Sequence, residues 1–368
     1  MNKVFSYVKK EPVLFIAIIL AIITCFFVPI DEEYLSYFDY NTLVCLFSML
    51  LVVVALKSTG VFEFISRKLI GLFRTRRGVI SALVFGTFFF DMIVANDMSL
   101  ITFLPLTYIV LHSTKNDKYL AITFVLQTIA ANMGGMITPY GNPQNLYLYS
   151  YYHIETLEFF SILIIQSLLV AVMLFICCRF IKNEPLKIKN TRIKKIPKIK
   201  LIIYTILFVL TILSIFRVVP YIITLIVAIS TIFIIDKENF KKVDYALILT
   251  FCAFFIFSGN MARIDVIKNF ISEIVTKNTL LAGILSCQLI SNVPTAIFLS
   301  KFTENYQALL VAVNVGSLGI LISSLASLIA LKEFLRHQPK KFWKYLGWFT
   351  LINTIFLIVL VTVTVIIT

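Results

Sequence analysis

The chain is short of charged residues. Only 14% of its 368 residues are Asp, Glu, Lys or Arg, whereas a soluble domain carries about 25%. Apolar residues make up 60% of the chain and the mean hydropathy is +0.95. Apolar runs long enough to cross a bilayer recur from one end to the other. The composition therefore excludes an ordinary soluble domain and predicts an all-α, multi-pass protein of the cell membrane.

Histidine and cysteine are also scarce. The three His and six Cys residues are scattered, with no metal-ligand spacing and no disulfide framework. We find no grouping of a nucleophile with a base, and no nucleotide-binding motif. The sequence thus predicts that the protein is not an enzyme and holds no cofactor other than a bound Na⁺. Drive by ATP would require a partner chain.

Basic residues give the chain a net charge of +14, but they cluster in short loops beside apolar runs. This is the pattern of the positive-inside rule, so we expect contact with membrane lipids and no nucleic-acid partner. The densest cluster, residues 179–200, is expected to be a cytoplasmic loop. Following the loop charges along the chain places the N-terminus in the cytoplasm and the C-terminus outside.

We expect five segments. The first has a basic start and an apolar core but no small-residue cleavage site, so we interpret it as a retained helix rather than a signal peptide. The segments are 1–35 (an N-terminal transmembrane helix of about residues 13–30), 36–180 (repeat 1), 181–200 (the basic loop), 201–342 (linking helices and repeat 2) and 343–368 (a C-terminal transmembrane helix).

Two apolar stretches are too short for two crossings and carry polar residues at their centres. The first, 79–111, contains Asn96 and Asp97, and the loops on both sides of it are basic. The second, 278–302, contains "SNVPT" at 291–295. We predict two re-entrant hairpins, the first from the cytoplasmic side with its turn at Asn96 and Asp97, and the second from outside.

Two further stretches contain helix-breaking residues. "NMGGMITPYGNPQN" lies within 119–150 and "NVGSLGILISSLAS" lies within 307–331. Glycine and proline at this density cannot sustain a helix. Irregular backbone at membrane depth is tolerated only inside protein or beside a watery cavity. Both stretches are therefore predicted to be discontinuous helices.

The two halves match in order. "VANDMSLI" at 94–101 aligns with "ISNVPTAI" at 290–297 and pairs Asn96 with Asn292. "NMGG" at 132–135 aligns with "NVGS" at 314–317 and pairs Asn132 with Asn314. The loop charges give the two copies opposite orientations, so we predict an inverted-topology repeat. Such repeats with paired broken helices are typical of secondary transporters, whose sites lie at the midplane.

A hairpin tip with Asn, a Gly-rich broken helix and a second, inverted copy of both resemble the pattern of the ion-transporter superfamily. That superfamily includes divalent anion–sodium symporters, citrate transporters, the arsenite pump membrane subunit and some sodium/proton antiporters. The resemblance covers about residues 35–335. Dicarboxylate symporters carry Ser-Asn-Thr at both tips, whereas this chain has Ala95-Asn96-Asp97 and Ser291-Asn292-Val293, which is more similar to the citrate and arsenite branches. The resemblance implies a homodimer.

The candidate site follows from these motifs. Polar groups at the tips and breaks are expected to bind substrate, namely Asn96, Ser99, Asn142, Asn145, Asn292, Thr295, Ser323 and Ser324. Groups expected to take part in ion coupling are Asp97, Asn96, Asn132, Gly134, Asn292, Asn314 and Gly316. The two tip asparagines have an alternative role, which is to cap a half-helix. The glycines have an alternative role too, which is to allow close packing of helices.

Asp97 is the most informative residue. A carboxylate at membrane depth costs about 2.5–3.5 kcal/mol on the insertion scale, and beside carbonyls and amides it suits Na⁺ or a proton. Val293 occupies the matching position in the second copy. Asp91 lies six residues before Asp97, either deeper in the hairpin or near its surface, and we do not include it in the site.

No Lys or Arg lies in either tip or either break. The sequence therefore favours a secondary active transporter of a small anion or oxyanion, such as a carboxylate or arsenite, coupled to Na⁺ or H⁺. A sodium/proton antiporter of the same superfamily and an ion channel are the alternatives. The sequence does not identify the substrate, the direction of transport or the coupling ion.

Overall fold

The computed structural model describes residues 11–186 and 196–367, so residues 187–195 of the predicted basic loop lie outside the described residues. Within the described ranges the chain is helical, and a single β-bridge joins Thr75 to Pro185. The helices are α2 (Pro12–Cys25), α3 (Tyr40–Ser58), α4 (Val61–Gly71), α5 (Arg76–Asp91), α6 (Asn96–Ser113), α7 (Leu120–Gly134), α8 (Pro143–Tyr151), α9 (Thr156–Arg179), α10 (Lys198–Ile215), α11 (Tyr221–Asp236), α12 (Tyr245–Arg263), α13 (Asp265–Lys277), α14 (Thr279–Ile290), α15 (Asn292–Leu299), α16 (Tyr306–Val315), α17 (Leu325–His337) and α18 (Phe342–Ile367). Short 3₁₀ turns are η1 (Glu32–Tyr37), η2 (Asp117–Tyr119), η3 (Gly135–Ile137), η4 (Lys237–Lys242), η5 (Leu321–Ser323) and η6 (Pro339–Lys341).

Among the described residues, six helical segments are long and apolar enough to cross a membrane, and a seventh is added if the bent pair α13 and α14 is one span. The six are Tyr40–Ser58, Asp117–Ile137, Thr156–Arg179, Lys198–Ile215, Tyr245–Arg263 and Pro339–Ile367. This confirms the predicted all-helical, multi-pass architecture.

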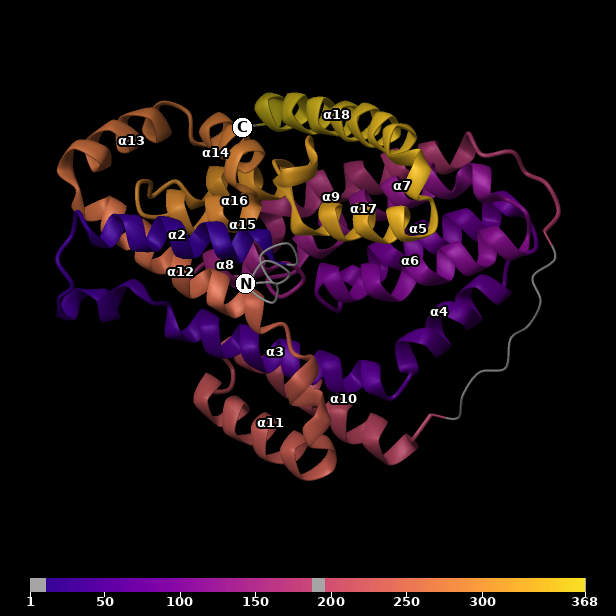
Figure 1. Ribbon diagram of the computed structural model, residues 1–368, viewed down its shortest axis with the longest axis horizontal. Helices are drawn as coiled ribbons and strands as arrows, with labels where there is room; N and C mark the ends of the chain where they lie inside the picture. Colours follow the sequence, from indigo (N-terminus) through magenta and orange to yellow (C-terminus); the bar gives the residue numbers. More distant parts are fainter. Residues whose placement is uncertain (1–10, 187–195, 368) are drawn as a thin grey trace.

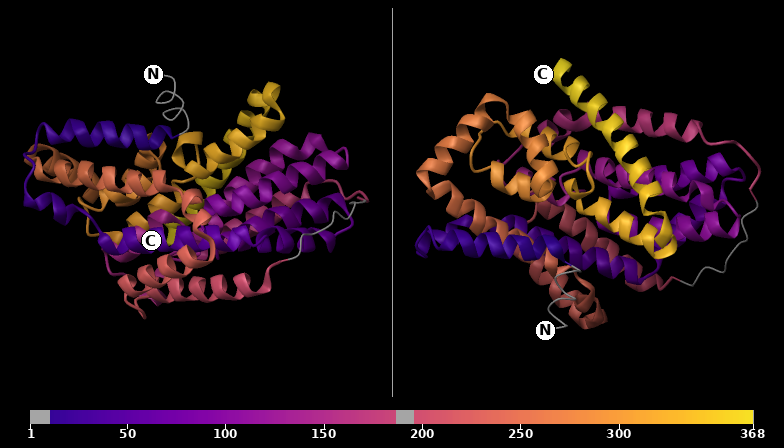
Figure 2. Two further views of the ribbon diagram at one scale, coloured as in Figure 1. Left: turned by 60° about the horizontal axis from the view of Figure 1, so that its bottom comes forward. Right: turned by 45° about the horizontal axis from the view of Figure 1, so that its top comes forward.

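Some helices, such as α7, lie in the interior of the molecule, and others, such as α9, α10 and α18, lie at its surface. In the apolar segment that contains α7, 89% of the residues are buried. In the apolar segments of α9, α10 and α18, only 28–33% of the residues are buried. The exposed side chains of those outer helices are mostly Ile, Leu, Val and Phe, as expected of a surface that faces lipid. Helices α10 and α11 pack on α3 along one edge of the molecule, and Figure 2 shows the same arrangement from two further directions.

Two pairs of consecutive helices occupy the places of the predicted hairpins. Helix pair 1 consists of α5 and α6, and helix pair 2 consists of α14 and α15. Pair 1 packs against α7 and α17, while pair 2 packs against α16, α8 and α12. The two pairs lie in the right and left halves of Figure 1, respectively. Each pair thus contacts one half of each interrupted helix.

Both predicted discontinuous helices are interrupted. Break 1 is residues 135–142, between α7 and α8, and break 2 is residues 316–324, between α16 and α17. Pro143 begins α8, where a missing N–H costs nothing. The Ser324 side chain caps α17 by accepting from the Ala326 N–H. Local sequence chemistry therefore stops and restarts each helix at the observed residues.

Asp39 and Asp244 have the same local role in the two halves. Each side chain accepts a hydrogen bond from the backbone N–H three residues later, at 3.1 Å, and so caps α3 or α12. These residues belong to the short motifs "FDY" and "VDY".

The structure differs from the prediction in three places. The first apolar run forms a helix of only 14 residues, α2, which begins near the middle of the molecule in Figure 1. The turn of helix pair 1 is residues 92–95, because Asn96 is already the first residue of α6. Helices α4 and α13 were not predicted, since each is short and has a polar face.

Candidate functional site

The two breaks meet through buried side chains. Asn314 Nδ2 donates to Asn145 Oδ1 at 2.7 Å, and Ser324 Oγ donates to Asn132 Oδ1 at 2.6 Å. All four residues are at most 1% exposed. Each bond joins one interrupted helix to the other, so residues that are distant in the chain form one polar crossing in the interior.

Break 1 is held by two asparagine amides. Asn145 Nδ2 lies 3.0–3.4 Å from the carbonyl oxygens of Gly135, Met136 and Thr138. Asn142 Nδ2 donates to the Asn132 carbonyl at 3.0 Å. These bonds satisfy backbone carbonyls that a continuous helix would have paired, as irregular backbone inside a membrane requires.

Break 2 is held by serine and glutamine. Ser323 Oγ lies 2.7 Å from the carbonyl oxygens of Ser317 and Ile320. Gln288 of helix pair 2 donates from Nε2 to the Gly316 and Leu318 carbonyls, at 2.8 and 3.0 Å. Its Oε1 accepts from the Ile320 N–H at 3.0 Å. A neutral amide therefore attaches helix pair 2 to break 2.

A carboxylate attaches helix pair 1 to break 1. Asp91 is fully buried, and its Oδ2 accepts from the Gly135 N–H at 2.6 Å. Its Oδ1 accepts from Ser99 Oγ at 3.2 Å. Asp91 was not among the predicted site residues. The signal that could have identified it was its position at the end of an apolar arm, where few carboxylates occur without a function.

Asp97 lies in the first turn of α6, and its Oδ1 is buried with no hydrogen-bond partner among the described residues. The carboxylates of Asp91, Asp244 and Glu11 are close enough to interact with it electrostatically. An unpaired carboxylate oxygen among like charges is a costly arrangement unless a cation or a proton joins it.

Asn96 and Asn292 occupy equivalent places, since each is the first residue of the second helix in its pair. In each, Oδ1 accepts from the next backbone N–H, at 2.9 and 3.0 Å. The two tip asparagines thus have matching local contacts, although the N-cap residues of the two helices are Ala95 and Ser291. The hydroxyl of Thr295 donates to the Ser291 carbonyl at 2.8 Å.

The two predicted coupling glycines lie at tight contacts. A Cβ on Gly134 would overlap the Phe88 carbonyl, and a Cβ on Gly316 would lie 2.6 Å from the Ala312 carbonyl oxygen. Close packing is therefore sufficient to explain glycine at both positions.

Several buried polar atoms, in or next to the two breaks and in the first turn of α6, have no hydrogen-bond partner within the described part of the chain. Buried polar groups are normally paired, so unpaired ones mark a place for an unobserved ion, ligand or water. The atoms are Asp97 Oδ1, Asn132 Nδ2, Asn142 Oδ1, Gln144 Oε1 and Asn314 Oδ1.

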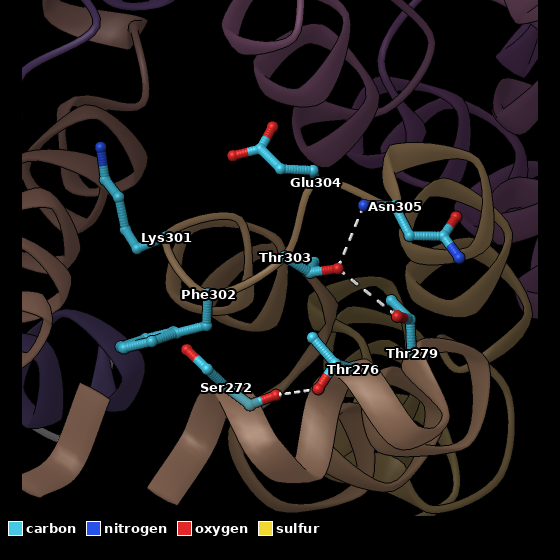
Figure 3. Close-up of a pocket in the computed structure, with 8 residues that line it drawn as sticks. All are labelled: Ser272, Thr276, Thr279, Lys301, Phe302, Thr303, Glu304 and Asn305. Atoms are coloured by element: carbon cyan, nitrogen blue, oxygen red, sulfur yellow. Dashed lines mark hydrogen bonds between the residues drawn. The ribbon is translucent and has the colours of Figure 1, made fainter. Parts of the chain in front are cut away.

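Two cavities differ in their relation to this crossing. One of about 50 Å³ connects Glu11 and Asp244 with Ser291 and Asn292, next to the turn of helix pair 2. A larger one of about 430 Å³ lies between α13 and the loop after α15, and none of the predicted site residues lines it. Figure 3 shows that, in this larger cavity, the Thr303 hydroxyl is hydrogen-bonded to the Thr279 hydroxyl and accepts a hydrogen bond from the Asn305 N–H.

An all-helical membrane protein with interrupted helices that cross at buried polar groups has the architecture of a membrane transporter. The comparisons agree with this class. The sequence profile of the citrate transporter family matches residues 6–330, so the chain belongs to that family.

Two relatives extend the comparison. The chain is 31% identical over 297 residues to the uncharacterized transporter MJ0456 of Methanocaldococcus jannaschii, covering 80% of this chain and 81% of the relative. It is 23% identical over 355 residues to the inner membrane protein YbiR of Escherichia coli, covering 93% and 94% of the two chains.

Proposed function

We propose that the protein is a secondary active transporter that moves a small anion or oxyanion, coupled to Na⁺ or H⁺. The observation that carries this proposal is the polar crossing of the two breaks, with the buried carboxylate of Asp91 attached to break 1. Membership of the citrate transporter family supports a small carboxylate as the first substrate class to test.

Four helix N-termini support an anionic substrate. Helices α6, α8, α15 and α17 all begin at a pair turn or at a break. A helix N-terminus carries a partial positive charge and free N–H groups, so it attracts anions without a Lys or Arg. The region has no basic side chain in either turn or break, and the helix ends would supply the positive potential.

The coupling ion would act at helix pair 1. Asp97 Oδ1 is free to accept a proton or to ligate Na⁺, and carboxylate and carbonyl oxygens are the ligands that hard cations prefer. Neutralising Asp97 would reduce its repulsion with Asp91, Asp244 and Glu11. The bound cation would also add positive charge beside the anion, which makes the two bind cooperatively.

Transport would then follow from movement of the two helix pairs relative to the outer helices. Each pair is anchored to its own break and packs on halves of both interrupted helices, so displacement of one pair would reshape both breaks. The small cavity beside Asn292 would be the beginning of a path toward the side that we predict to be cytoplasmic.

A sodium/proton antiporter is the second candidate, because helix pair 1 holds two acidic side chains, Asp91 and Asp97, that suit a cation as cargo. A channel would instead allow flux without coupling. Protein reconstituted in liposomes distinguishes the three, with citrate, succinate and arsenite as test solutes.

We expect a solute to accumulate only when a Na⁺ or pH gradient is imposed. Na⁺-driven pH change without any solute would support the antiporter. Flux of a solute that follows its own gradient and ignores both ion gradients would support the channel. Either of the last two results would overturn the proposed ion-coupled anion transport.

A further inference from the structure

A polar cavity of about 390 Å³ lies where α5 begins and α6 ends, which is the end of helix pair 1 opposite its turn. Three basic side chains, Arg76, Lys115 and Lys118, line this cavity together with one carboxylate, Glu184. It is separate from the crossing of the breaks, and none of the predicted site residues lines it. We call it the basic cavity.

Arg76 is the unusual member of this group, because its side chain is only 3% exposed. Its Nη1 donates to Asn116 Oδ1 at 3.3 Å and its guanidinium lies 4.7 Å from the centre of the Tyr119 ring. Nη2 forms an ion pair with Glu184, while Nε has no hydrogen-bond partner among the described residues. A buried guanidinium requires an anion, and here donor capacity is left over.

The two lysines add positive charge that no carboxylate among the described residues neutralises. Lys118 Nζ lies 5.3 Å from the centre of the same Tyr119 ring that Arg76 contacts. No ion pair joins Lys115 or Lys118 to a carboxylate within residues 11–186 and 196–367. The neighbouring carboxylate, Asp117, is bound by His112 Nδ1 at 2.8 Å. Two cations at the cavity therefore lack a counter-charge.

The backbone around Glu184 is attached next to α5 independently of the Arg76–Glu184 ion pair. The Arg76 N–H donates to the Glu184 carbonyl at 2.8 Å, and the Leu186 N–H donates to the Arg74 carbonyl at 2.8 Å. Arg77 Nε donates to the Ile181 carbonyl at 2.8 Å. The Glu184 side chain is 58% exposed, so its carboxylate can leave Arg76 while the segment stays attached to α5.

We propose that the basic cavity binds a phosphate-class anion, which displaces the Glu184 carboxylate from Arg76 and is held also by Lys115 and Lys118. A guanidinium matches phosphate oxygens in a bidentate manner, and lysines add point charges around them. The anion is either the headgroup of an acidic lipid or a free phosphate compound. The basic-residue pattern predicts that the cavity faces the cytoplasm, where both are present. This inference does not depend on the transported substrate.

The test compares ligand-induced thermal stabilisation of purified full-length protein in neutral detergent. The probes are inorganic pyrophosphate, against NaCl of equal ionic strength, and micellar phosphatidylglycerol, against phosphatidylcholine. A ligand that binds only the folded protein raises its melting temperature. We expect stabilisation of the wild type by pyrophosphate, by phosphatidylglycerol or by both, and the effective probe identifies the source of the anion.

Three variants locate the binding. Loss of charge in K115Q/K118Q should weaken the apparent affinity about three- to tenfold, and E184Q should strengthen it about three- to fivefold by removing the competing carboxylate. K340Q/K341Q is the matched control, because it removes two exposed lysines from a different basic loop, and its affinity should equal that of the wild type.

The substitutions at lysine are on the surface, so these variants should fold. The proposal is overturned if neither probe stabilises the wild type, or if K115Q/K118Q responds like K340Q/K341Q. It is also overturned if E184Q binds more weakly than the wild type, since Glu184 would then be part of the site rather than its competitor.

Discussion

Helix pair 1 and helix pair 2 each attach to a break through a side chain near the end of their first helix. In pair 1 this side chain is Asp91, which accepts from the Gly135 N–H. In pair 2 it is Gln288, which bonds to backbone groups of Gly316, Leu318 and Ile320 within break 2. The tips differ likewise, since Asp97 of pair 1 aligns with Val293 of pair 2. The common geometry supports a shared architecture, and the charge confined to pair 1 supports coupling on that side.

The largest expected effect comes from removing the charge of Asp91. In Asp91→Asn, the Gly135 N–H loses its charged acceptor. It then faces either the uncharged amide oxygen of Asn or the amide nitrogen, which cannot accept. Hydrogen bonds to charged groups contribute about 1.5–3 kcal/mol, so ion-coupled transport should fall about 10- to 100-fold. Initial uptake rates in liposomes measure this loss.

Gln288→Met is the matched change in helix pair 2. It leaves the Gly316 and Leu318 carbonyls without their side-chain donor, so we expect a lower melting temperature but an unchanged dependence of transport on the ion gradient. Loss of ion dependence in Gln288→Met but not in Asp91→Asn would reverse the assignment of coupling to pair 1.

The second prediction makes the two tips alike. Val293→Asp places a carboxylate in pair 2 beside the cavity that Glu11 and Asp244 line. A charge at such depth costs about 2.5–3.5 kcal/mol, so the variant should unfold at a clearly lower temperature than Val293→Asn. Equal melting temperatures for the two variants would show that a charge is tolerated at either tip.

The third prediction concerns the two breaks. Asn145→Ala removes the amide that bonds three carbonyls of break 1, and unpaired buried groups should lower the free energy of unfolding by about 1–3 kcal/mol. Continuing the alignment of Asn132 with Asn314 along the chain pairs Asn145 with Ser327, whose buried hydroxyl has no partner among the described residues. Ser327→Ala should therefore be nearly neutral. Chemical unfolding in detergent measures the free energy of unfolding of both variants. Equal losses of stability in Asn145→Ala and Ser327→Ala would show that the two positions do not differ in the way proposed.

The smallest effect is expected outside the membrane, where Arg263 at the end of α12 binds Asp31 at 2.6–2.9 Å. The hydrogen bond from Arg263 lowers the pKa of Asp31 below its ordinary value. A carboxyl group with a lowered pKa stabilises the fold above its unfolded pKa, near 3.9, and this contribution is lost as the pH falls through the folded pKa.

Asp31→Asn should consequently lower the melting temperature slightly at neutral pH. Its difference from the wild type should shrink as the pH falls below about 3.9 and disappear below the folded pKa of Asp31, as melting curves at pH 7 and over a series of acidic pH values would show. A difference that persists unchanged in acid would indicate that packing, not the charge pair, is what the substitution disturbs.

Much of the fold was predictable because it depends on local chemistry. Long apolar runs gave the spans, and the glycines and prolines of "MGGMITPYGNP" located break 1. The helices α4 and α13 were missed because amphipathic segments of 11 and 13 residues do not resemble spans. The short helix α2 was overestimated because the apolar run continues beyond Cys25 while the backbone leaves the helix.

The site was only partly predictable. Polar residues in apolar surroundings made Asn132, Asn145 and Asn314 candidates, and the structure pairs Asn145 with Asn314 and Asn132 with Ser324. Their partners could not be predicted, because the pairing of Asn145 with Asn314 spans 169 positions in the chain. Asp91 was left out for the same reason, since its partner, the Gly135 N–H, is a backbone group 44 positions away.

Asp97 is the residue that we propose to sense the coupling ion. The most direct measurement is the melting temperature of the wild type and Asp97→Asn in NaCl and in choline chloride, each at pH 6 and pH 8. We predict that the wild-type melting temperature changes with Na⁺ or with pH and that Asp97→Asn loses this change while remaining folded. A wild type that responds to neither, or an Asp97→Asn variant that keeps the full wild-type response, would contradict the account.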